Sequence, residues 1–283
     1  MMRIAIIGLG LIGGSMGLAL RRAKADLEVV GLARRGEVAA KALEIGAVDR
    51  TERYLLAAVK GAALVIIATP AIATKGIMAE MGENLPEACI VTDTASTKAQ
   101  VMGWAEKSLP PSISFIGGHP MAGKETSGIA AANGDLFQGC TYCLTPGRSA
   151  TKEAIDMVEG LVKQIGATPL FIDASEHDSL VAAISHLPIL ISAALVSMTT
   201  KSPLWPRMTR LAATGYRDLT RLASGNPEMS RDICLTNRGP ILHWLDEYIA
   251  ELRELRRLVS EGGEELEIAF IRAREGREGW LRM

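Results

Sequence analysis

Gly8-Leu9-Gly10-Leu11-Ile12-Gly13, the glycine-rich turn near the N-terminus, decides the fold of this chain. It follows an apolar run, Arg3–Ile7, and opens a stretch with helical periodicity, Leu11–Ala23. Gly8 permits a tight turn, Gly10 lets a pyrophosphate approach the backbone, and Gly13 lets the helix pack closely on the strand. The helix N-terminus then offers free N–H groups to the phosphates. The pattern predicts that residues 8–13 bind a dinucleotide.

The rest of the first half alternates short runs rich in Ile and Val with helical stretches. Helical periodicity marks Gly36–Glu44 and Lys152–Ile165. The runs predicted to be strands are Arg3–Ile7, Glu28–Leu32, Leu64–Ala68, Ala88–Thr92, Ser114–Gly117, Thr141–Thr145 and Pro169–Ile172. Alternation of this kind predicts an α/β fold built on a doubly wound parallel sheet of the Rossmann type, covered by helices on both faces.

After Asp173 no strand-like run recurs. The stretches predicted to be helical are Ser175–Thr199, Leu204–Leu222, Met229–Asn237 and Arg238–Ser260. For 283 residues two domains are expected. We therefore predict a dinucleotide-binding domain over residues 1–170 and an all-helical domain over residues 171–283 that binds substrate and mediates dimerisation.

One predicted helix carries an apolar stripe with steps of four and three residues. Its members are Ile241, Leu245, Tyr248, Leu252, Leu255 and Val259. Such a stripe is typical of an amphipathic helix that packs on its own domain, and equally of a seam shared with a second subunit. We favour a homodimer.

Composition excludes several classes of protein. With 31 Lys+Arg against 32 Asp+Glu, the net charge of -1 argues against a nucleic-acid partner. The apolar run Ile189–Val196 is too short to cross a bilayer, and the N-terminus leads straight into the glycine turn without a signal peptide. Four cysteines fit a reducing compartment, and Cys140-x-x-Cys143 lacks a second pair of metal ligands. We expect a soluble cytoplasmic protein with no membrane partner and no metal.

The end of the second predicted strand bears on the choice of cofactor. An NAD-binding domain usually has an acidic residue there, which binds the ribose 2′-hydroxyl. Here the sequence reads Ala33-Arg34-Arg35, and guanidinium groups suit a 2′-phosphate. We favour NADP over NAD, although both arginines would also suit a solvated loop. Ala68-Thr69-Pro70, at the end of the third predicted strand, is expected to line the same cofactor.

Polar residues gather after two later strands, in Asp93–Lys98 and in Gly117–Gly128. Both segments are expected to face the crevice of the glycine turn. His119, predicted to lie in a glycine-flanked loop after its strand, is the candidate base that takes a proton from a substrate hydroxyl as hydride leaves the same carbon. His186 is either functional or a core histidine. His177 and His243 are predicted to be surface or interface residues without a role.

Taken together, five motifs resemble those of the prephenate/arogenate dehydrogenases of tyrosine biosynthesis. They are Gly8-x-Gly-x-x-Gly, Ser96-x-Lys98, Gly118-His119-Pro120-Met121-Ala122-Gly123, Ser185-His186-Leu187-Pro188 and Asp218-Leu219-Thr220-Arg221. The resemblance implies an oxidative decarboxylation: hydride passes from a ring carbon to the cofactor, a histidine takes the hydroxyl proton, and carbon dioxide departs. The product is 4-hydroxyphenylpyruvate from prephenate, the substrate we expect, or tyrosine from arogenate.

The resemblance also implies roles for individual residues and an intertwined homodimer. His119 matches the catalytic histidine, and Ser96 matches the serine that orients this histidine and the nicotinamide. Arg221 matches the arginine that binds substrate carboxylate. Three further residues are implied to form the substrate site: Asp218 holds Arg221, His186 is a second active-site histidine, and Glu125 stands at the entrance.

The chain departs from the family pattern at positions near the substrate. Lys124 replaces a common Thr, Ile189 replaces a second His, and Ser230 replaces an aromatic residue. We expect Lys124 to contact the substrate side chain. Two other functions are possible. A β-hydroxyacid dehydrogenase would need a catalytic lysine in a glycine-rich helical motif, but Lys201 has no such setting. A nonenzymatic NADP sensor need not retain the catalytic set.

Overall fold

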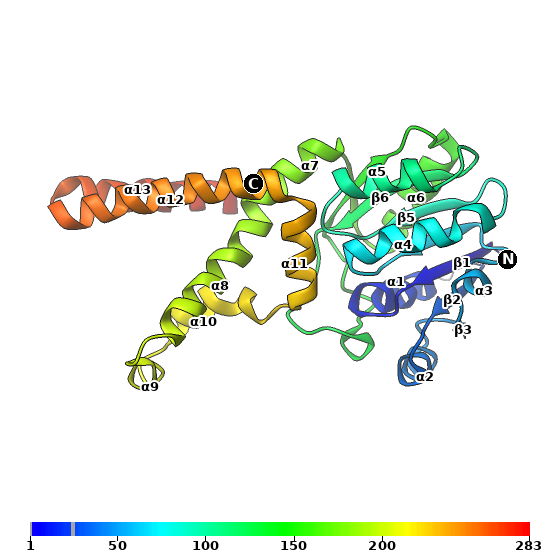
Figure 1. Ribbon diagram of the computed structural model, residues 1–283, viewed down its shortest axis with the longest axis horizontal. Coiled ribbons are helices and arrows are strands. Elements are labelled where there is room, and N and C mark those ends of the chain that lie inside the picture. The colour runs from blue at the N-terminus through cyan, green and yellow to red at the C-terminus, as the bar shows by residue number, and fades with distance from the viewer. Residues whose placement is uncertain (1, 24–25) are drawn as a thin grey trace. The chain divides into compact units, whose positions relative to one another are not determined.

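A computed structural model describes residues 2–23 and 26–283 of the chain (Figure 1). Tertiary contacts divide it into two compact units, residues 1–238 and residues 239–283, which are described separately. This division differs from the predicted boundary after residue 170. The sequence prediction followed the change from strands to helices, whereas the contacts keep the first helices after that change with the sheet. The boundary after residue 170 stays a prediction.

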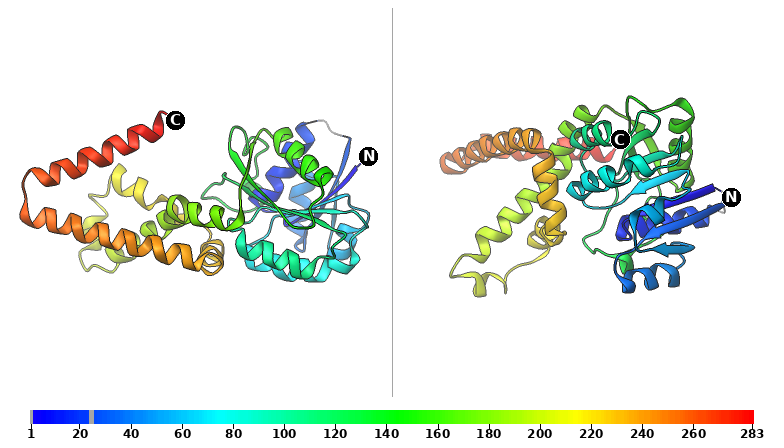
Figure 2. Two further views of the ribbon diagram at one scale, coloured as in Figure 1. Left: turned by 90° about the horizontal axis from the view of Figure 1, so that it is seen from above. Right: turned by 45° about the vertical axis from the view of Figure 1, so that its right-hand side comes forward.

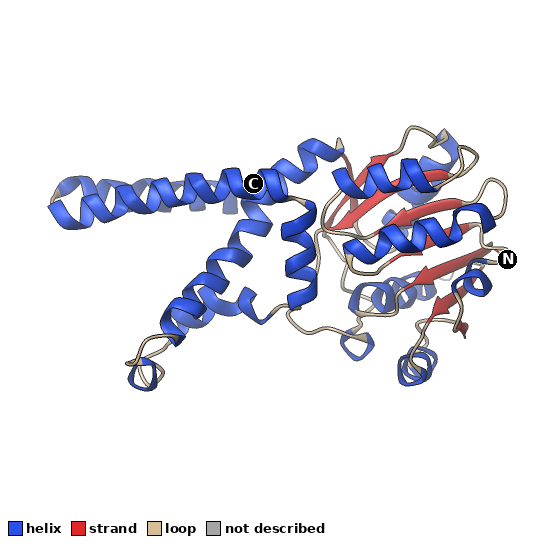
Figure 3. Ribbon diagram, in the orientation of Figure 1, coloured by secondary structure: helices blue, strands red, loops and turns tan. Residues whose placement is uncertain are grey.

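The first unit is built on one eight-stranded sheet with the order β3-β2-β1-β4-β5-β6-β7-β8 (Figure 3). The strands are β1 (Met2–Ile7), β2 (Leu27–Leu32), β3 (Arg50–Glu52), β4 (Leu64–Ile67), β5 (Ile90–Asp93), β6 (Ser114–Pro120), β7 (Thr141–Pro146) and β8 (Thr168–Phe171). Neighbours pair in parallel except β6 and β7. The α/β fold is therefore confirmed, and a wholly parallel sheet is not.

The antiparallel pairing has a local cause. A parallel connection needs a crossover, usually a helix, that returns the chain to the opposite edge of the sheet. Between β6 and β7 the structure has only the short 3-10 helix η2 (Ile129–Ala131). The chain therefore re-enters the sheet from the edge at which β6 ends, and the connecting loop, residues 121–140, stays at that edge.

Alternate residues of the strands supply the two apolar faces of the sheet. Ile4 and Ile6 pack with α1 (Leu11–Arg22), α2 (Gly36–Glu44) and α6 (Lys152–Gln164). On the other face, the helices are α3 (Leu55–Val59), α4 (Ala71–Met81) and α5 (Ala99–Ser108). Every side chain of β4 is buried, as expected for a strand covered on both faces.

A continuous helix of 27 residues, Ala174–Thr200, follows the sheet. It comprises α7 (Ala174–Val181), the π-helical turn η3 (Ala182–His186) and α8 (Leu187–Thr200). Pro188 explains the wide turn, because a proline has no N–H to donate and its ring clashes with the carbonyl four residues earlier. By length and composition this helix could cross a membrane, a test that core helices of soluble proteins also pass. The prediction from the sequence considered only Ile189–Val196, which is part of this helix.

Shorter helices complete the first unit: α9 (Trp205–Met208), α10 (Thr214–Thr220), the 3-10 helix η4 (Arg221–Ser224) and α11 (Pro227–Thr236). The second unit consists of α12 (Arg238–Glu261) and α13 (Glu264–Leu281). Positive φ angles at Gly262 and Gly263 turn the chain between them, and the two helices diverge from this turn (Figure 2). Along the predicted stripe Ile241 is buried, whereas Leu252 and Val259 are exposed.

Candidate active site

A cavity of about 560 Å³ opens at the carboxyl ends of the central strands, within the first unit. One part of its wall is the glycine turn, and another is the loop after β6. Helical residues close it, among them Ser185, Ile189, Arg221 and Met229. Its volume suits a small-molecule site, and open α/β sheets bind ligands at this edge.

The glycine turn has the geometry that a phosphate group requires. Gly8 has φ +106°, a conformation that favours glycine, and a Cβ on Gly13 would overlap the carbonyl oxygen of Gly8. A Cβ on Gly10 would meet nothing within 4 Å, and Gly10 lines the cavity. The backbone at Gly10 is therefore accessible to a ligand, whereas the space beside Gly13 is filled by the Gly8 carbonyl. Residues 8–13 fit a dinucleotide.

The other predicted cofactor residues fall into two groups. Leu11, Ile12 and the segment 68–70 line the cavity, whereas Leu9 is buried in the core. Ala33 is buried just beyond β2, followed by exposed Arg34 and Arg35. Arg35 Nη1 lies 3.3 Å from a carboxylate oxygen of Glu37. Both arginines lie outside the cavity wall, at the edge of the sheet where β1 enters the glycine turn.

His119 belongs to β6 rather than to the loop after it, because β6 extends to Pro120 and pairs His119 with Cys143 of β7. The partner strand β7 was predicted, but its antiparallel pairing with β6, which supports this extension, was not. His119 lines the cavity and is 7% exposed. Its Nδ1 lies 2.9 Å from Nε2 of His177. Burial, reinforced by neighbouring His177 and Lys98, lowers the pKa of His119 well below 6.5.

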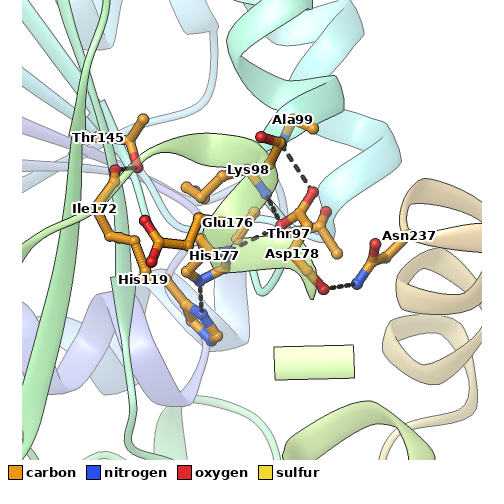
Figure 4. Close-up of polar contacts among 12 residues, drawn as sticks. Thr97, Lys98, Ala99, His119, Thr145, Ile172, Glu176, His177, Asp178 and Asn237 are labelled. Carbon is orange, nitrogen blue, oxygen red and sulfur yellow. Dashed lines mark hydrogen bonds and ion pairs between the residues drawn. The ribbon is translucent and has the colours of Figure 1, made fainter. Parts of the chain in front are cut away.

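His177 is completely buried, so the predicted surface or interface position was wrong. Its ring lies beside that of His119, joined to it by a hydrogen bond (Figure 4). Its Nδ1 lies 2.8 Å from Oδ1 of Asp178. The Asp178 carboxylate also accepts backbone N–H bonds from Lys98, at 2.7 Å, and from Ala99, at 2.9 Å. Asp173 caps α7 through the backbone N–H groups of Ser175 and Glu176, which fixes the first turn of the helix that carries His177. Adjacent His and Asp residues just after this capping aspartate were the available sequence signal.

Ser96 is half-buried and lines the cavity together with His119. Among the contacts of the described residues, the hydrogen bond of the His119 ring goes to His177 and not to Ser96. The structure thus brings Ser96 and His119 to one cavity. The side chain that contacts the His119 ring is therefore His177 and not Ser96, which was predicted to orient it.

Arg221 lies in η4 and forms an ion pair with Glu125 of the loop after β6. Both residues line the cavity, as does exposed Lys124. Asp218, which the resemblance placed beside Arg221, is exposed on α10 and does not line the cavity. The partner of Arg221 in the structure is Glu125.

His186 ends the π turn and is 1% exposed. Its Nδ1 lies 3.1 Å from Nδ2 of Asn237, and burial lowers its pKa to about 4. Ser185 and Ile189 of the same helix face the cavity, but His186 does not line it. The structure therefore places His186 behind the wall rather than in it.

The cavity thus joins three chemical capabilities. Its glycine turn accommodates phosphate groups, neutral His119 is available to accept a proton, and Arg221 offers a guanidinium to a carboxylate. Within residues 2–23 and 26–283 no group of three or more His, Cys, Asp or Glu side chains is arranged to hold a metal ion. The four thiols are free.

Comparisons with known proteins agree on one family. Residues 16–170 match the family model "Prephenate dehydrogenase, nucleotide-binding domain", and residues 173–272 match "Prephenate dehydrogenase, dimerization domain". The chain is 39% identical to a prephenate dehydrogenase of Bacillus subtilis over 98% of this chain and 75% of that protein. It is 34% identical to a cyclohexadienyl dehydrogenase of Zymomonas mobilis over 97% and 94%. The crystal structure of prephenate dehydrogenase from A. aeolicus with hydroxyphenyl propionate and NAD+ aligns with a TM-score of 0.92 at 27% identity, over 99% of this chain and 98% of that one.

Proposed function

The chain belongs to the prephenate dehydrogenase family, and on that premise we propose that it converts prephenate to 4-hydroxyphenylpyruvate by oxidative decarboxylation in tyrosine biosynthesis. The observation that carries the proposal is the presence of His119, Arg221 and the glycine turn on one cavity wall. A proton acceptor, a carboxylate-binding group and a dinucleotide site are the three parts that the reaction needs.

The bound nicotinamide dinucleotide supplies the hydride acceptor of the reaction. His119 takes the proton of the substrate hydroxyl, which it can do at neutral pH because its lowered pKa keeps the ring neutral. Arg221 exchanges Glu125 for a substrate carboxylate and holds the ring in place. Ser96 contacts the reacting end of the substrate from the same wall. Loss of carbon dioxide then leaves an aromatic ring, which drives the reaction forward.

The cofactor is a nicotinamide dinucleotide, and we infer a preference for NADP. The support is the exposed pair Arg34 and Arg35 directly after β2, where an acidic residue would repel a 2′-phosphate. Residues 8–13 and 68–70 would hold the rest of the molecule. The structure of the A. aeolicus relative contains NAD+, and this observation concerns the cofactor of that protein.

We propose prephenate rather than arogenate as the preferred substrate. The two differ in the side chain, which ends in a keto acid in prephenate and in an amino acid in arogenate. Lys124 adds a positive charge to the loop that lines the cavity, and it favours the more negative molecule. Arogenate remains the alternative, and the same assay separates the two.

A second copy of the chain is the partner that we propose. Residues 173–272 match a dimerisation domain, and large apolar side chains there are exposed: Ile184 (73%), Met198 (66%) and Leu211 (84%). Burial of this surface in a homodimer would remove it from water. We propose a cytoplasmic location, because the four free cysteines fit a reducing compartment.

The experiment that tests the proposed function is a spectrophotometric assay. The protein is mixed with prephenate and NADP, and the absorbance of the reduced nicotinamide is followed together with carbon dioxide release. A rise in both establishes the reaction, and NAD and arogenate are then compared by kcat/KM. If neither substrate gives a rise with either cofactor, the proposed function is wrong.

A further inference from the structure

Asp178, His177 and His119 form a buried chain of hydrogen bonds. The bonds around Asp178 determine which ring nitrogen carries the proton in each histidine. As a carboxylate, Asp178 only accepts, and its neighbours Lys98 and Ala99 contribute backbone N–H donors. The bond of 2.8 Å from His177 Nδ1 to Asp178 Oδ1 must therefore carry a proton on Nδ1. In the neutral ring, Nε2 of His177 is then an acceptor.

The acceptor at Nε2 of His177 in turn determines the protonated nitrogen of His119. Its Nδ1 lies 2.9 Å from the accepting Nε2 of His177, so Nδ1 of His119 carries a proton and donates it. A neutral imidazole with a proton on Nδ1 has its lone pair on Nε2. Nε2 is the ring nitrogen that His177 does not engage, and His119 lines the cavity. The chain thus prepares His119 to accept a proton from the cavity side.

We propose that His177 and Asp178 are positioning residues that hold His119 in the tautomer with Nε2 unprotonated and that share the positive charge which His119 acquires. This inference rests on the proposed function for the identity of the proton donor. In the step, the O–H bond of the substrate breaks and an N–H bond forms at Nε2 of His119. The proton on Nδ1 shifts toward Nε2 of His177, whose charge is then balanced by Asp178.

Burial strengthens the hydrogen bonds that join His119, His177 and Asp178. His177 is 0% exposed and Asp178 is 2% exposed, so water does not replace either hydrogen bond. An imidazolium alone in this environment would be strongly disfavoured, as the lowered pKa of His119 indicates. A neighbouring ring that accepts the proton, beside a fixed carboxylate, offsets that penalty at the moment of transfer.

The first test reads the tautomer and needs no catalytic activity. The nitrogen chemical shifts of the imidazole rings in ¹⁵N-histidine-labelled protein distinguish a proton on Nδ1 from one on Nε2, and His119→Asn identifies the His119 resonances. We expect Nδ1–H in the wild type and loss of this preference in His177→Ala. A wild-type ring protonated on Nε2 would overturn the inference, even if the protein oxidises prephenate.

The second test is a double-mutant cycle for turnover. His177→Ala is expected to lower kcat about 10-fold or more with less than about a 3-fold change in KM. His177→Gln, which keeps an acceptor near the position of Nε2, is expected to recover part of the loss. In a His119→Ala background, His177→Ala is expected to cause no further loss, because it acts through His119.

A matched control comes from the neighbouring strand. Thr145→Val deletes a partly buried hydrogen bond of 2.9 Å to the Ile172 carbonyl, and Thr145 makes no hydrogen bond to His119. It should leave kcat unchanged. Equal losses for His177→Ala in both backgrounds, or unchanged kcat in His177→Ala, would refute the positioning role. Wild-type protein inactive on every substrate would refute the proposed function alone, since the tautomer is read independently.

Discussion

Lys98 and Asp93 form a completely buried ion pair beneath the active-site cavity, with Lys98 Nζ 2.5 Å from Asp93 Oδ2. Lys98 Nζ also donates to the Gly118 carbonyl at 2.6 Å, and Asp93 Oδ1 accepts from the Gly118 N–H at 3.0 Å. Both backbone groups of Gly118 are therefore fixed by this pair. Gly118 directly precedes His119, so the pair determines where the candidate base lies.

Lys98→Met is expected to destabilise the fold by about 3–5 kcal/mol, because it leaves the Asp93 charge buried without its partner. The free energy of unfolding in urea, at fixed protein concentration, measures the effect. Adding Asp93→Asn to Lys98→Met should recover part of the loss, since both charges are then gone. A single variant as stable as the wild type would show that the pair is dispensable.

His119→Ala is expected to lower kcat by about 10²–10⁴-fold, the usual contribution of a general base. KM should change far less. In the wild type, kcat/KM should be flat through neutral pH and fall only at a pH well below 6.5. The sign follows because the base works unprotonated and burial lowers its pKa. A profile that falls between pH 7 and pH 6.5 would contradict this assignment.

Arg221→Ala should raise KM for prephenate while kcat changes little, because the guanidinium binds a group that does not react. Glu125→Gln should do the opposite and lower KM, since Glu125 occupies Arg221 in the structure and competes with the substrate carboxylate. The Arg221 side chain is 60% exposed, so this second effect should be modest, about 2- to 5-fold. Steady-state kinetics of both variants provide the comparison, and an increased KM in Glu125→Gln would exclude competition.

Arg34→Ala is expected to weaken NADP binding and leave NAD nearly unchanged, because only NADP carries a 2′-phosphate. The dissociation constants are measured by fluorescence titration of each cofactor. Arg22→Ala, which removes an ion pair with Asp135, is a suitable control for loss of an exposed arginine. If both cofactors weaken equally in Arg34→Ala, the preference for NADP has no basis at this position.

The stability of the fold should fall as the pH drops below 6.5, and His186 should account for part of the fall. Burial lowers its pKa to about 4 in the folded protein, so the unfolded chain binds more protons between these values. The slope is at most about 1.4 kcal/mol per pH unit for one group. Unfolding at pH 7 and pH 5 should show a smaller loss in His186→Gln. An equal loss would assign the titration to other groups.

Local patterns predicted the strands well, because the burial of a strand determines which of its residues are apolar. Leu64–Ala68 was predicted within a residue of β4, since a fully buried strand is continuously apolar. Glu28–Leu32 was predicted within a residue of β2, most of which is apolar. β3 was missed because its residues, Arg-Thr-Glu, are polar and belong to an edge strand. Helix α13 was missed because its charged residues show no clear apolar face.

Several residues predicted for the candidate site line one cavity, but the hydrogen bonds of the site were not predicted. His119, Ser96, Arg221, Glu125 and Lys124 line one cavity, as the motifs led us to expect. The partner of the base was missed, because His119 and His177 are 58 positions apart and no local pattern indicates their contact. His186, a functional histidine by its motif, is buried and does not line the cavity, and its role stays a prediction.

The α/β fold and the dinucleotide turn were predictable from the sequence because their patterns are local, and the family was predictable from five short motifs. Glycines at 8, 10 and 13 act within one turn, and a strand's periodicity is visible within a few residues. Three features emerge only in the folded chain: β7 runs antiparallel to β6, Arg221 pairs with Glu125, and His177 contacts His119. Each of these depends on segments brought together by packing, and no local pattern encodes the distance between them.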